Sequence, residues 1–95
     1  MGTTKQPLIT VVMPNYNGHR FVEQAIDSVL HQTYPNFELL VVDDCSKDDS
    51  LSLIQQKAQS DKRIKVIALE HNAGVANARN VGIKEAKGKF IALLD

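Results

Sequence analysis

The sequence predicts an α/β fold in which a parallel sheet of about four strands is covered by helices. Two observations carry this prediction. Short runs of apolar, mostly β-branched residues alternate with longer segments whose apolar residues recur every three or four positions. The connections between them are short, so successive strands run parallel and are joined by right-handed crossovers. The 95 residues are enough for one small domain with its own core.

The first predicted strand covers Ile9 to Met13, a run too short to form a helix with one dry face. Pro14 cannot donate a ladder hydrogen bond, so we expect the strand to end there. Asn15, Tyr16 and Asn17 follow at the carboxyl end of the strand, which is where open parallel sheets bind ligands. Tyr16 is suited either to stacking on a planar base or to packing within its own loop.

A helix and a second buried strand are predicted next. The stripe that predicts the helix consists of Val22, Ala25, Ile26, Val29 and Leu30. A run that contains Pro35 closes this helix. The strand covers Phe37 to Val42 and leads into Asp43 and Asp44, which point to opposite sides along an extended chain. One acid can therefore face a ligand while the other holds a loop or caps the following helix.

The second half of the chain repeats the alternation, with a third strand from Ile64 to Leu69 between two more helices. The predicted inward faces of these helices are Leu51, Ile54 and Ala58 in one, and Val75, Ala78, Gly82 and Ala86 in the other. A glycine inside a helix costs about 1 kcal/mol relative to alanine. We therefore expect Gly82 to mark a close approach between this last helix and the sheet.

Turn residues and one arginine complete the pattern. Asn72 and Gly74 tolerate left-handed backbone, and Gly88 is expected to cap the last helix before a fourth strand over 90–94. Asp95 then follows at the tip of that strand, so four strand ends present polar residues along one edge of the sheet. Arg79, about one turn into the last helix, either reaches a diphosphate or base there or remains a solvated helix arginine.

Composition excludes several classes of protein and site. The 11 basic and 11 acidic residues cancel and form no basic stripe, which argues against a nucleic-acid partner. A lone Cys45 excludes an internal disulfide, and no apolar run approaches the roughly 18 residues of a membrane span. Neither common glycine-rich nucleotide motif occurs, and His19, His31 and His71 lack metal-ligand spacing.

Five segments carry a resemblance when they are taken together, in order and spacing. They are Val12–Asn17, Ser28–Tyr34, Phe37–Ser46, Asn72–Gly74 with Ala78–Gly82, and Gly88–Asp95. These segments resemble the amino-terminal half of a family 2 glycosyltransferase, and the similarity spans nearly everything from Leu8 to Asp95. The resemblance implies a GT-A fold, which is a Rossmann-like parallel sheet with helices on both faces. Such a domain binds a nucleotide sugar, and the enzyme inverts the anomeric carbon of the transferred sugar.

The resemblance also implies roles for individual residues. The implied nucleotide-binding residues are Pro14, Tyr16, Asn17, Asp44 and Arg79. In the family, the loop that matches 14–17 contacts the nucleotide, the acid that matches Asp44 binds the base or ribose, and Arg79 matches an arginine near the base or diphosphate. Asp95 matches the first acid of the family's D-x-D metal motif, where Mn²⁺ or Mg²⁺ neutralises the diphosphate.

The sequence stops before the second acid of that motif and before the family's later general base. We therefore expect residues 1–6 to be a polar leader, disordered or left from expression, and residues 7–95 to be a nucleotide-sugar-binding subdomain, incomplete at its C-terminus. Glycosyl transfer is expected of a longer parent enzyme, whereas this chain has no catalytic residue of its own. It should bind a UDP-type nucleotide weakly and hold no metal tightly.

The sequence also leads to expectations about the partners of the chain and its cellular compartment. Unpaired strand edges invite pairing with another copy of the chain, so a homo-oligomer is expected. The expected compartment is the cytoplasm, with the parent enzyme at the cytoplasmic face of a membrane. Two alternatives remain open: a receiver-like or flavodoxin-like signalling or binding module, which also places adjacent acids after a strand, and a folded fragment without a ligand.

Overall fold

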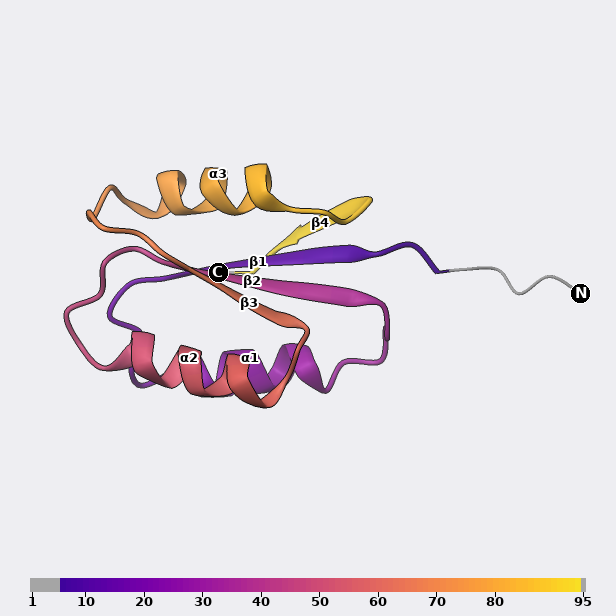
Figure 1. Cartoon of the computed structure of the whole chain (residues 1–95), viewed down its shortest axis with the longest axis horizontal. Helices are drawn as coiled ribbons and strands as arrows, with labels where there is room; N and C mark the ends of the chain where they lie inside the picture. The colour runs from indigo at the N-terminus through magenta and orange to yellow at the C-terminus, as the bar shows by residue number, and fades with distance from the viewer. Residues whose placement is uncertain (1–5, 95) are drawn as a thin grey trace, which may run out of the picture.

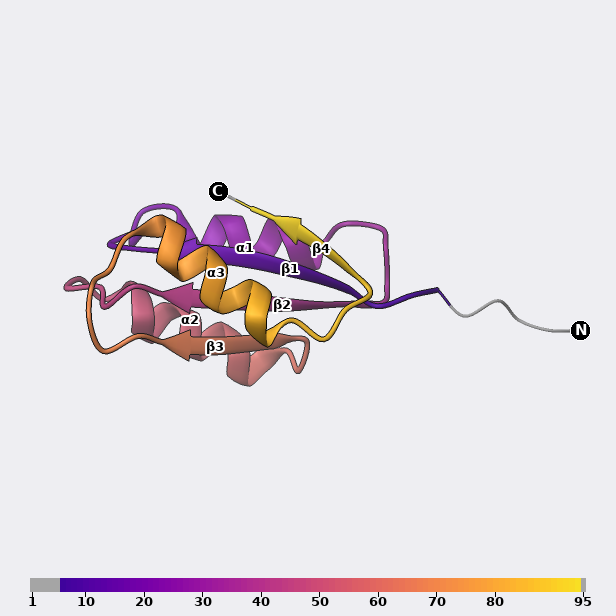
Figure 2. The ribbon, with the colours of Figure 1, turned by 90° about the horizontal axis from the view of Figure 1, so that it is seen from above.

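A computed structural model describes residues 6–94, which form four parallel strands and three helices. The elements are β1 (Ile9–Asn15), α1 (Val22–Leu30), β2 (Phe37–Asp43), α2 (Ser50–Ser60), β3 (Ile64–Ala68), α3 (Val75–Glu85) and β4 (Phe90–Leu93). The strand order is β3-β2-β1-β4, with α1 and α2 on one face of the sheet and α3 on the other (Figures 1 and 2). The predicted α/β, Rossmann-like fold with helices on both faces is confirmed.

Strand β2 is the most buried element of the sheet. All seven of its residues are buried, because β1 and β3 flank it and helices cover both of its faces. One core lies between the sheet and the α1/α2 layer and includes Ile26, Leu39 and Ile54. A smaller core lies under α3 and contains Val12 and Ala78. Burial on both faces explains why this strand reads as a continuous apolar run rather than an alternating one.

Pro14 lies inside β1, so the expectation that the strand ends there is wrong. The chain remains paired through Asn15, which lies opposite Asp43. Val12 accepts a hydrogen bond from Leu94 N–H on the β4 side (2.9 Å), and alternate residues of a strand bond to the same side. The nitrogen of Pro14 therefore faces the β4 side, where pairing with β1 extends only to Val12 within the described residues. The proline costs no ladder hydrogen bond at this position.

Helix α3 packs closely on the sheet through Gly82, as predicted. A Cβ added to Gly82 would lie 2.4 Å from Cγ1 of Val12, so only glycine fits this contact. The predicted inward face is wrong at its two ends. Val75 is 53% exposed because the first turn of α3 projects beyond the sheet, and Ala86 follows the helix in extended backbone.

Gly88 does not cap α3 in a left-handed conformation, which corrects a third expectation. It packs against β1 instead, and its N–H donates to Thr10 Oγ1 (2.8 Å). Thr10 in turn donates to Glu38 Oε2 (2.6 Å), which also accepts the Lys87 N–H (2.9 Å). This buried relay fixes the α3–β4 connection to the two central strands. The glycine is needed because an added Cβ would lie 2.6 Å from Thr10 N.

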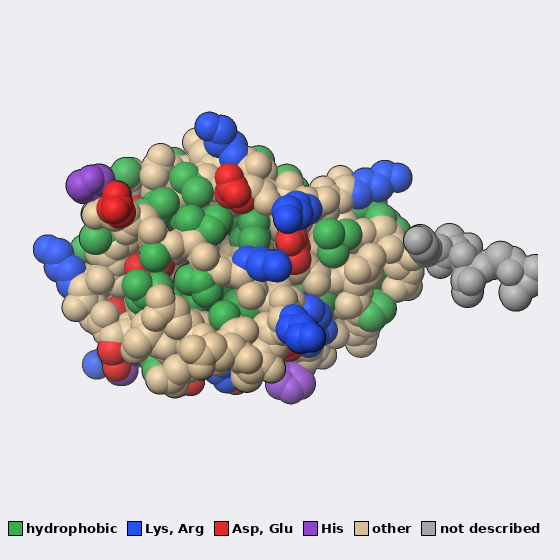
Figure 3. Space-filling view, in the orientation of Figure 1, with side chains coloured by type: hydrophobic (Ala, Val, Ile, Leu, Met, Phe, Trp, Pro, Cys, Tyr) green, Lys and Arg blue, Asp and Glu red, His purple; other side chains and the backbone are tan. Residues whose placement is uncertain are grey.

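Two further features are a patch of basic side chains and a membrane-spanning helix, and neither is found in the part of the molecule described next. On the face drawn in Figure 3, Lys and Arg side chains are interspersed with Asp and Glu instead of forming one patch. Within residues 6–94, no helix has both the length and the apolar character needed to cross a bilayer.

The contact between Gly82 and Val12 yields a stability prediction. Gly82→Ala should lower the free energy of unfolding by about 2 kcal/mol, because the new methyl group forces α3 away from β1. Asn80→Ala is the matched control at an exposed position of the same helix, and it should stay within about 0.5 kcal/mol of the parent chain. Urea unfolding followed by circular dichroism measures both variants. Equal stability of the two variants would show that α3 is not in tight contact with the sheet.

Candidate functional site

A hollow of about 260 Å³ opens at the carboxyl ends of β1 and β2, beside the start of α3. Its lining consists of Pro14, Asn15, Tyr16, Asp44, Asn72, Gly74, Val75 and Ala78. Of the predicted nucleotide-binding residues, Pro14, Tyr16 and Asp44 therefore meet at one place. Tyr16 is 46% exposed, which leaves part of its ring accessible to a ligand. Ligand sites of open parallel sheets occupy this end of the strands.

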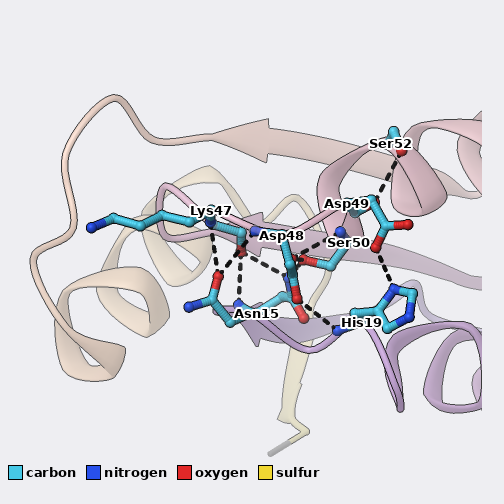
Figure 4. Close-up of polar contacts among 9 residues, drawn as sticks. Asn15, His19, Lys47, Asp48, Asp49, Ser50 and Ser52 are labelled. Atoms are coloured by element: carbon cyan, nitrogen blue, oxygen red, sulfur yellow. Dashed lines mark hydrogen bonds and ion pairs between the residues drawn. The ribbon is translucent and has the colours of Figure 1, made fainter.

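Asp43 holds the loops on the α1/α2 side of the sheet. Its Oδ1 accepts hydrogen bonds from Asn15 Nδ2 (2.8 Å) and Ser46 Oγ (2.6 Å), and its Oδ2 accepts the Ser46 N–H (3.0 Å). Asn15 Nδ2 also donates to Ser50 Oγ (3.0 Å) at the start of α2. Asp43 is 1% exposed, so it faces no ligand. It links β1, its own loop and α2 into one polar cluster, part of which is drawn in Figure 4.

Asp44 points to the other face of the sheet, as expected for the neighbour of Asp43 on an extended chain. Its Oδ1 accepts the Ala73 N–H (3.0 Å) and its Oδ2 accepts the Gly74 N–H (2.9 Å). These amides belong to the loop between β3 and α3. The carboxylate is thus both part of the hollow's lining and an anchor for a neighbouring loop.

Asn17 lies outside the lining of the hollow. Its backbone is left-handed, with φ of 52°, and its Oδ1 accepts the N–H groups of Lys47 (2.8 Å) and Asp48 (3.4 Å). Its own N–H donates to Ser46 Oγ (2.9 Å). Asn17 therefore joins the β1–α1 loop to the β2–α2 loop. Together with Asn15 it fixes the backbone on both sides of Tyr16.

A second set of contacts secures the same two loops (Figure 4). Asp48 accepts hydrogen bonds from Ser50 Oγ (2.5 Å), Ser50 N–H (2.9 Å) and His19 N–H (3.1 Å). The Ser50 hydroxyl contributes most to holding the pKa of Asp48 below its ordinary value. The His19 ring pairs with the carboxylate of Asp49. These contacts join the loop after β1 to the start of α2, and none of His19, Asp48 and Asp49 lines the hollow.

Arg79 is the last of the predicted nucleotide-binding residues. Arg79 is half-buried on α3, next to Ala78 but not in the lining of the hollow. Asp95, the predicted metal ligand, lies outside the described residues. Within residues 6–94, no cluster of three or more His, Cys, Asp or Glu side chains could hold a metal ion. The described residues thus provide a hollow for an organic ligand but no complete metal site.

Several lining and anchoring residues were not predicted as site residues. Val75 and Ala78 were assigned to a buried helix face, yet both border the hollow. Ser46 and Ser50 bind the buried Asn15–Asp43 pair, and the position of Ser46 three residues after Asp43 is the signal in the sequence that could have indicated its role. Hydroxyl groups shortly after an acidic strand end commonly bond back to it.

Comparison with protein families and curated relatives gives consistent matches. A family model described as Glycosyl transferase family 2 matches residues 10–95. The putative teichuronic acid biosynthesis glycosyltransferase TuaG of Bacillus subtilis is 42% identical, over 98% of this chain and 37% of that protein. The Escherichia coli UDP-Glc:alpha-D-GlcNAc-diphosphoundecaprenol beta-1,3-glucosyltransferase WfgD is 46% identical, over 93% and 34%. The chain thus spans about a third of the length of these curated relatives.

Solved structures share the fold. A crystal structure of S. aureus TarS in complex with UDP superposes with a TM-score of 0.83 at 36% identity, over 92% of this chain and 26% of that one. The mannosyltransferase PcManGT from Pyrobaculum calidifontis, in complex with GDP-Man and Mn²⁺, superposes with a TM-score of 0.84 at 28% identity, over 93% and 27%.

The role of Asn17 in joining two loops can be tested by substitution. Asn17→Ala should lower the free energy of unfolding by about 1–2 kcal/mol, because the amides of Lys47 and Asp48 lose their acceptor. Asn17→Gly loses the same acceptor but accommodates the left-handed backbone, so it should cost less than alanine. Chemical denaturation compares the two variants. Two variants as stable as the parent chain would contradict the proposed role.

Proposed function

Because the chain belongs to glycosyl transferase family 2, we propose that its hollow binds the nucleotide of a nucleotide-diphosphate sugar. One observation carries the proposal: Pro14, Tyr16 and Asp44, from two neighbouring strand ends, border the same hollow of about 260 Å³. These are three of the residues to which the family resemblance assigns nucleotide contacts. The position of the hollow, at the carboxyl edge of a parallel sheet, supports the same ligand class.

In this proposal, Tyr16 and Asp44 supply complementary contacts. The half-exposed ring of Tyr16 offers a face on which a planar base stacks. Asp44 already accepts two backbone hydrogen bonds, but a carboxylate has about four lone-pair sites, so it can also accept an N–H or O–H of the base or ribose. Asn17 contributes by fixing the loop that carries Tyr16, and Arg79 stands on the neighbouring helix near the diphosphate.

A uridine diphosphate sugar is the donor class we propose. TarS, which is 36% identical to this chain, was solved in complex with UDP, and WfgD is named for its UDP-Glc donor. The mannosyltransferase that was solved with GDP-Man is less similar to this chain, at 28% identity, so it gives less support to a guanosine diphosphate donor.

Transfer itself is proposed for a longer protein of which these residues form the nucleotide-binding part. Its reaction moves the sugar from the nucleotide diphosphate to an acceptor hydroxyl with inversion, which needs a general base to deprotonate that hydroxyl. We assign no residue of 6–94 to this role, so the chain alone should bind nucleotide without transferring sugar. The diphosphoundecaprenol-linked acceptor in the name of WfgD supports action at a membrane surface, and we propose the cytoplasmic face for the longer protein.

A divalent cation is part of the proposal for the longer protein only. Mn²⁺ or Mg²⁺ bound with the help of Asp95 would supply positive charge to balance the departing diphosphate. The Mn²⁺ complex of the Pyrobaculum mannosyltransferase supports this assignment. Since residues 6–94 contain no cluster of metal ligands, we expect no tight metal binding by this chain. The match to the family over 10–95 does not favour the receiver-like alternative.

Titration with UDP tests the proposed ligand. We expect amide chemical-shift changes that cluster around Tyr16, Asp44 and residues 72–78, with a dissociation constant in the millimolar range, about 1 mM. Mn²⁺ should change the affinity little. Tyr16→Ala should weaken binding about tenfold through lost stacking, whereas Tyr34→Ala, at the opposite end of the strands, should not. An absence of shifts around Asp44 at about 10 mM UDP would refute the proposal.

We further propose that the chain associates with itself through β4. This edge strand exposes all four of its residues, including the large apolar side chains Phe90, Ile91 and Leu93. An exposed apolar edge is a template for pairing with a second strand. The proposal concerns these residues alone and not the assembly of a longer protein.

Light scattering over a range of concentrations tests this association. The mean mass should rise above that of the 10.5 kDa monomer as concentration increases. Ile91→Lys should shift this rise to higher concentration, because it adds charge to the edge. Ser52→Lys adds the same charge on exposed α2 and serves as the control. A constant monomeric mass would count against self-association.

A further inference from the structure

Residues 70–74, which follow Leu69 in the loop between β3 and α3, form one wall of the hollow. Leu69 packs on the core under α3, but residues 70–74 have no apolar anchor of their own. Asn72 and Gly74 border the hollow, and Val75 follows them at the start of α3. No side chain from Glu70 to Val75 is buried. Loops without buried apolar contacts open at low free-energy cost unless polar contacts hold them. The position of this wall therefore depends on hydrogen bonds.

Asp44 makes three hydrogen bonds to this loop, while the Leu69 N–H at the start of the loop donates to the backbone oxygen of Asp43 (2.9 Å). The two carboxylate oxygens of Asp44 accept the N–H groups of Ala73 (3.0 Å) and Gly74 (2.9 Å), while its backbone oxygen accepts the Asn72 side-chain amide (3.4 Å). Asp44 is only 3% exposed, so water does not compete strongly for these bonds. Hydrogen bonds to an ionised acceptor are roughly twice as strong as neutral ones. The negative charge also lies near the positive end of the α3 dipole.

The backbone of Gly74 fits this arrangement. Its φ of 96° and ψ of 163° lie in a region that side-chain-bearing residues rarely adopt. Successive N–H groups of Ala73 and Gly74 can then point at the same carboxylate. A Cβ on Gly74 would meet no atom within 4 Å, so glycine is required here for its conformation and not for lack of space.

We propose that Asp44 is a positioning residue that clamps the β3–α3 loop and thereby shapes the nucleotide pocket. The effect on nucleotide affinity rests on the proposed function, whereas the contacts between Asp44 and the loop are present without a ligand. This role is additional to the direct contact with the base or ribose proposed above, which would act on the ligand and leave the loop unchanged. The clamp predicts that the loop and the nucleotide affinity respond together when either end of the Asp44–amide contact is removed.

Two variants remove opposite ends of the contact. Asp44→Asn replaces one acceptor oxygen with an NH₂ group, which cannot accept a backbone N–H. Ala73→Pro removes the Ala73 N–H and leaves Asp44 intact, and Ala73 does not line the hollow. Hydrogen exchange of the Gly74 amide should accelerate at least about tenfold in both variants. UDP affinity should fall about fivefold or more in both.

Two controls separate the clamp from other effects. Ala73→Ser keeps the amide N–H and should leave both exchange and affinity unchanged. Tyr16→Ala should weaken UDP binding without accelerating exchange at Gly74, because it removes ligand contact but not the clamp. Slow exchange of the Val41 amide, in buried β2, confirms that each variant is folded.

The outcomes distinguish failure of the clamp from failure of the proposed function. Unchanged exchange at Gly74 in Asp44→Asn would overturn the clamp even if UDP binds. Normal UDP affinity in Ala73→Pro despite faster exchange at Gly74 would show that the clamped loop does not set the affinity, which also overturns the inference. If the parent chain binds no UDP, the proposed ligand is wrong, while faster exchange in both variants still establishes the clamp in the ligand-free protein.

Discussion

The alternation of side chains at the end of β2 organises this end of the molecule. Because neighbours on an extended strand point to opposite faces, Asp43 reaches the α1/α2 side and Asp44 reaches the α3 side. Asp43 binds the end of β1 and the loop that follows β2, and Asp44 binds the loop that follows β3. One central strand end thus fixes the neighbouring strand end and two loops. A hollow bounded by separate loops keeps its shape because these loops share one rigid support.

Burying two neighbouring acids is unfavourable unless each is supplied with donors. Asp43, 1% exposed, accepts from the Asn15 amide, the Ser46 hydroxyl and the Ser46 N–H. Asp44 accepts from two consecutive backbone amides. Ser46 is only three residues from Asp43, but the Asn15 amide and the two backbone amides that bind Asp44 lie 28 to 30 positions from their acceptors, so those bonds form only when the sheet is assembled. Their formation therefore couples the local conformation of the loops to the parallel pairing of the strands.

The sequence predicted the fold well because its strongest signals are local. The apolar stripe from Val22 to Leu30 coincides with α1, and Gly82 indicated the tight contact with the sheet. Errors occurred where tertiary context decides. Pro14 stays in β1 because its nitrogen faces a side without further pairing, and Gly88 serves a contact with Thr10 instead of a helix cap. Neither circumstance can be read from neighbouring residues.

The depth of the hollow is controlled from a point that no ligand touches. Ala78, at the floor, lies one turn before Gly82 on the same stiff helix, and Gly82 sets how near that helix sits to Val12. A bulkier side chain at position 82 would push α3 away from the sheet and so move Ala78 and Val75 away from Tyr16. Substitutions that change the distance between α3 and the sheet can therefore alter ligand preference while every residue of the binding surface stays the same.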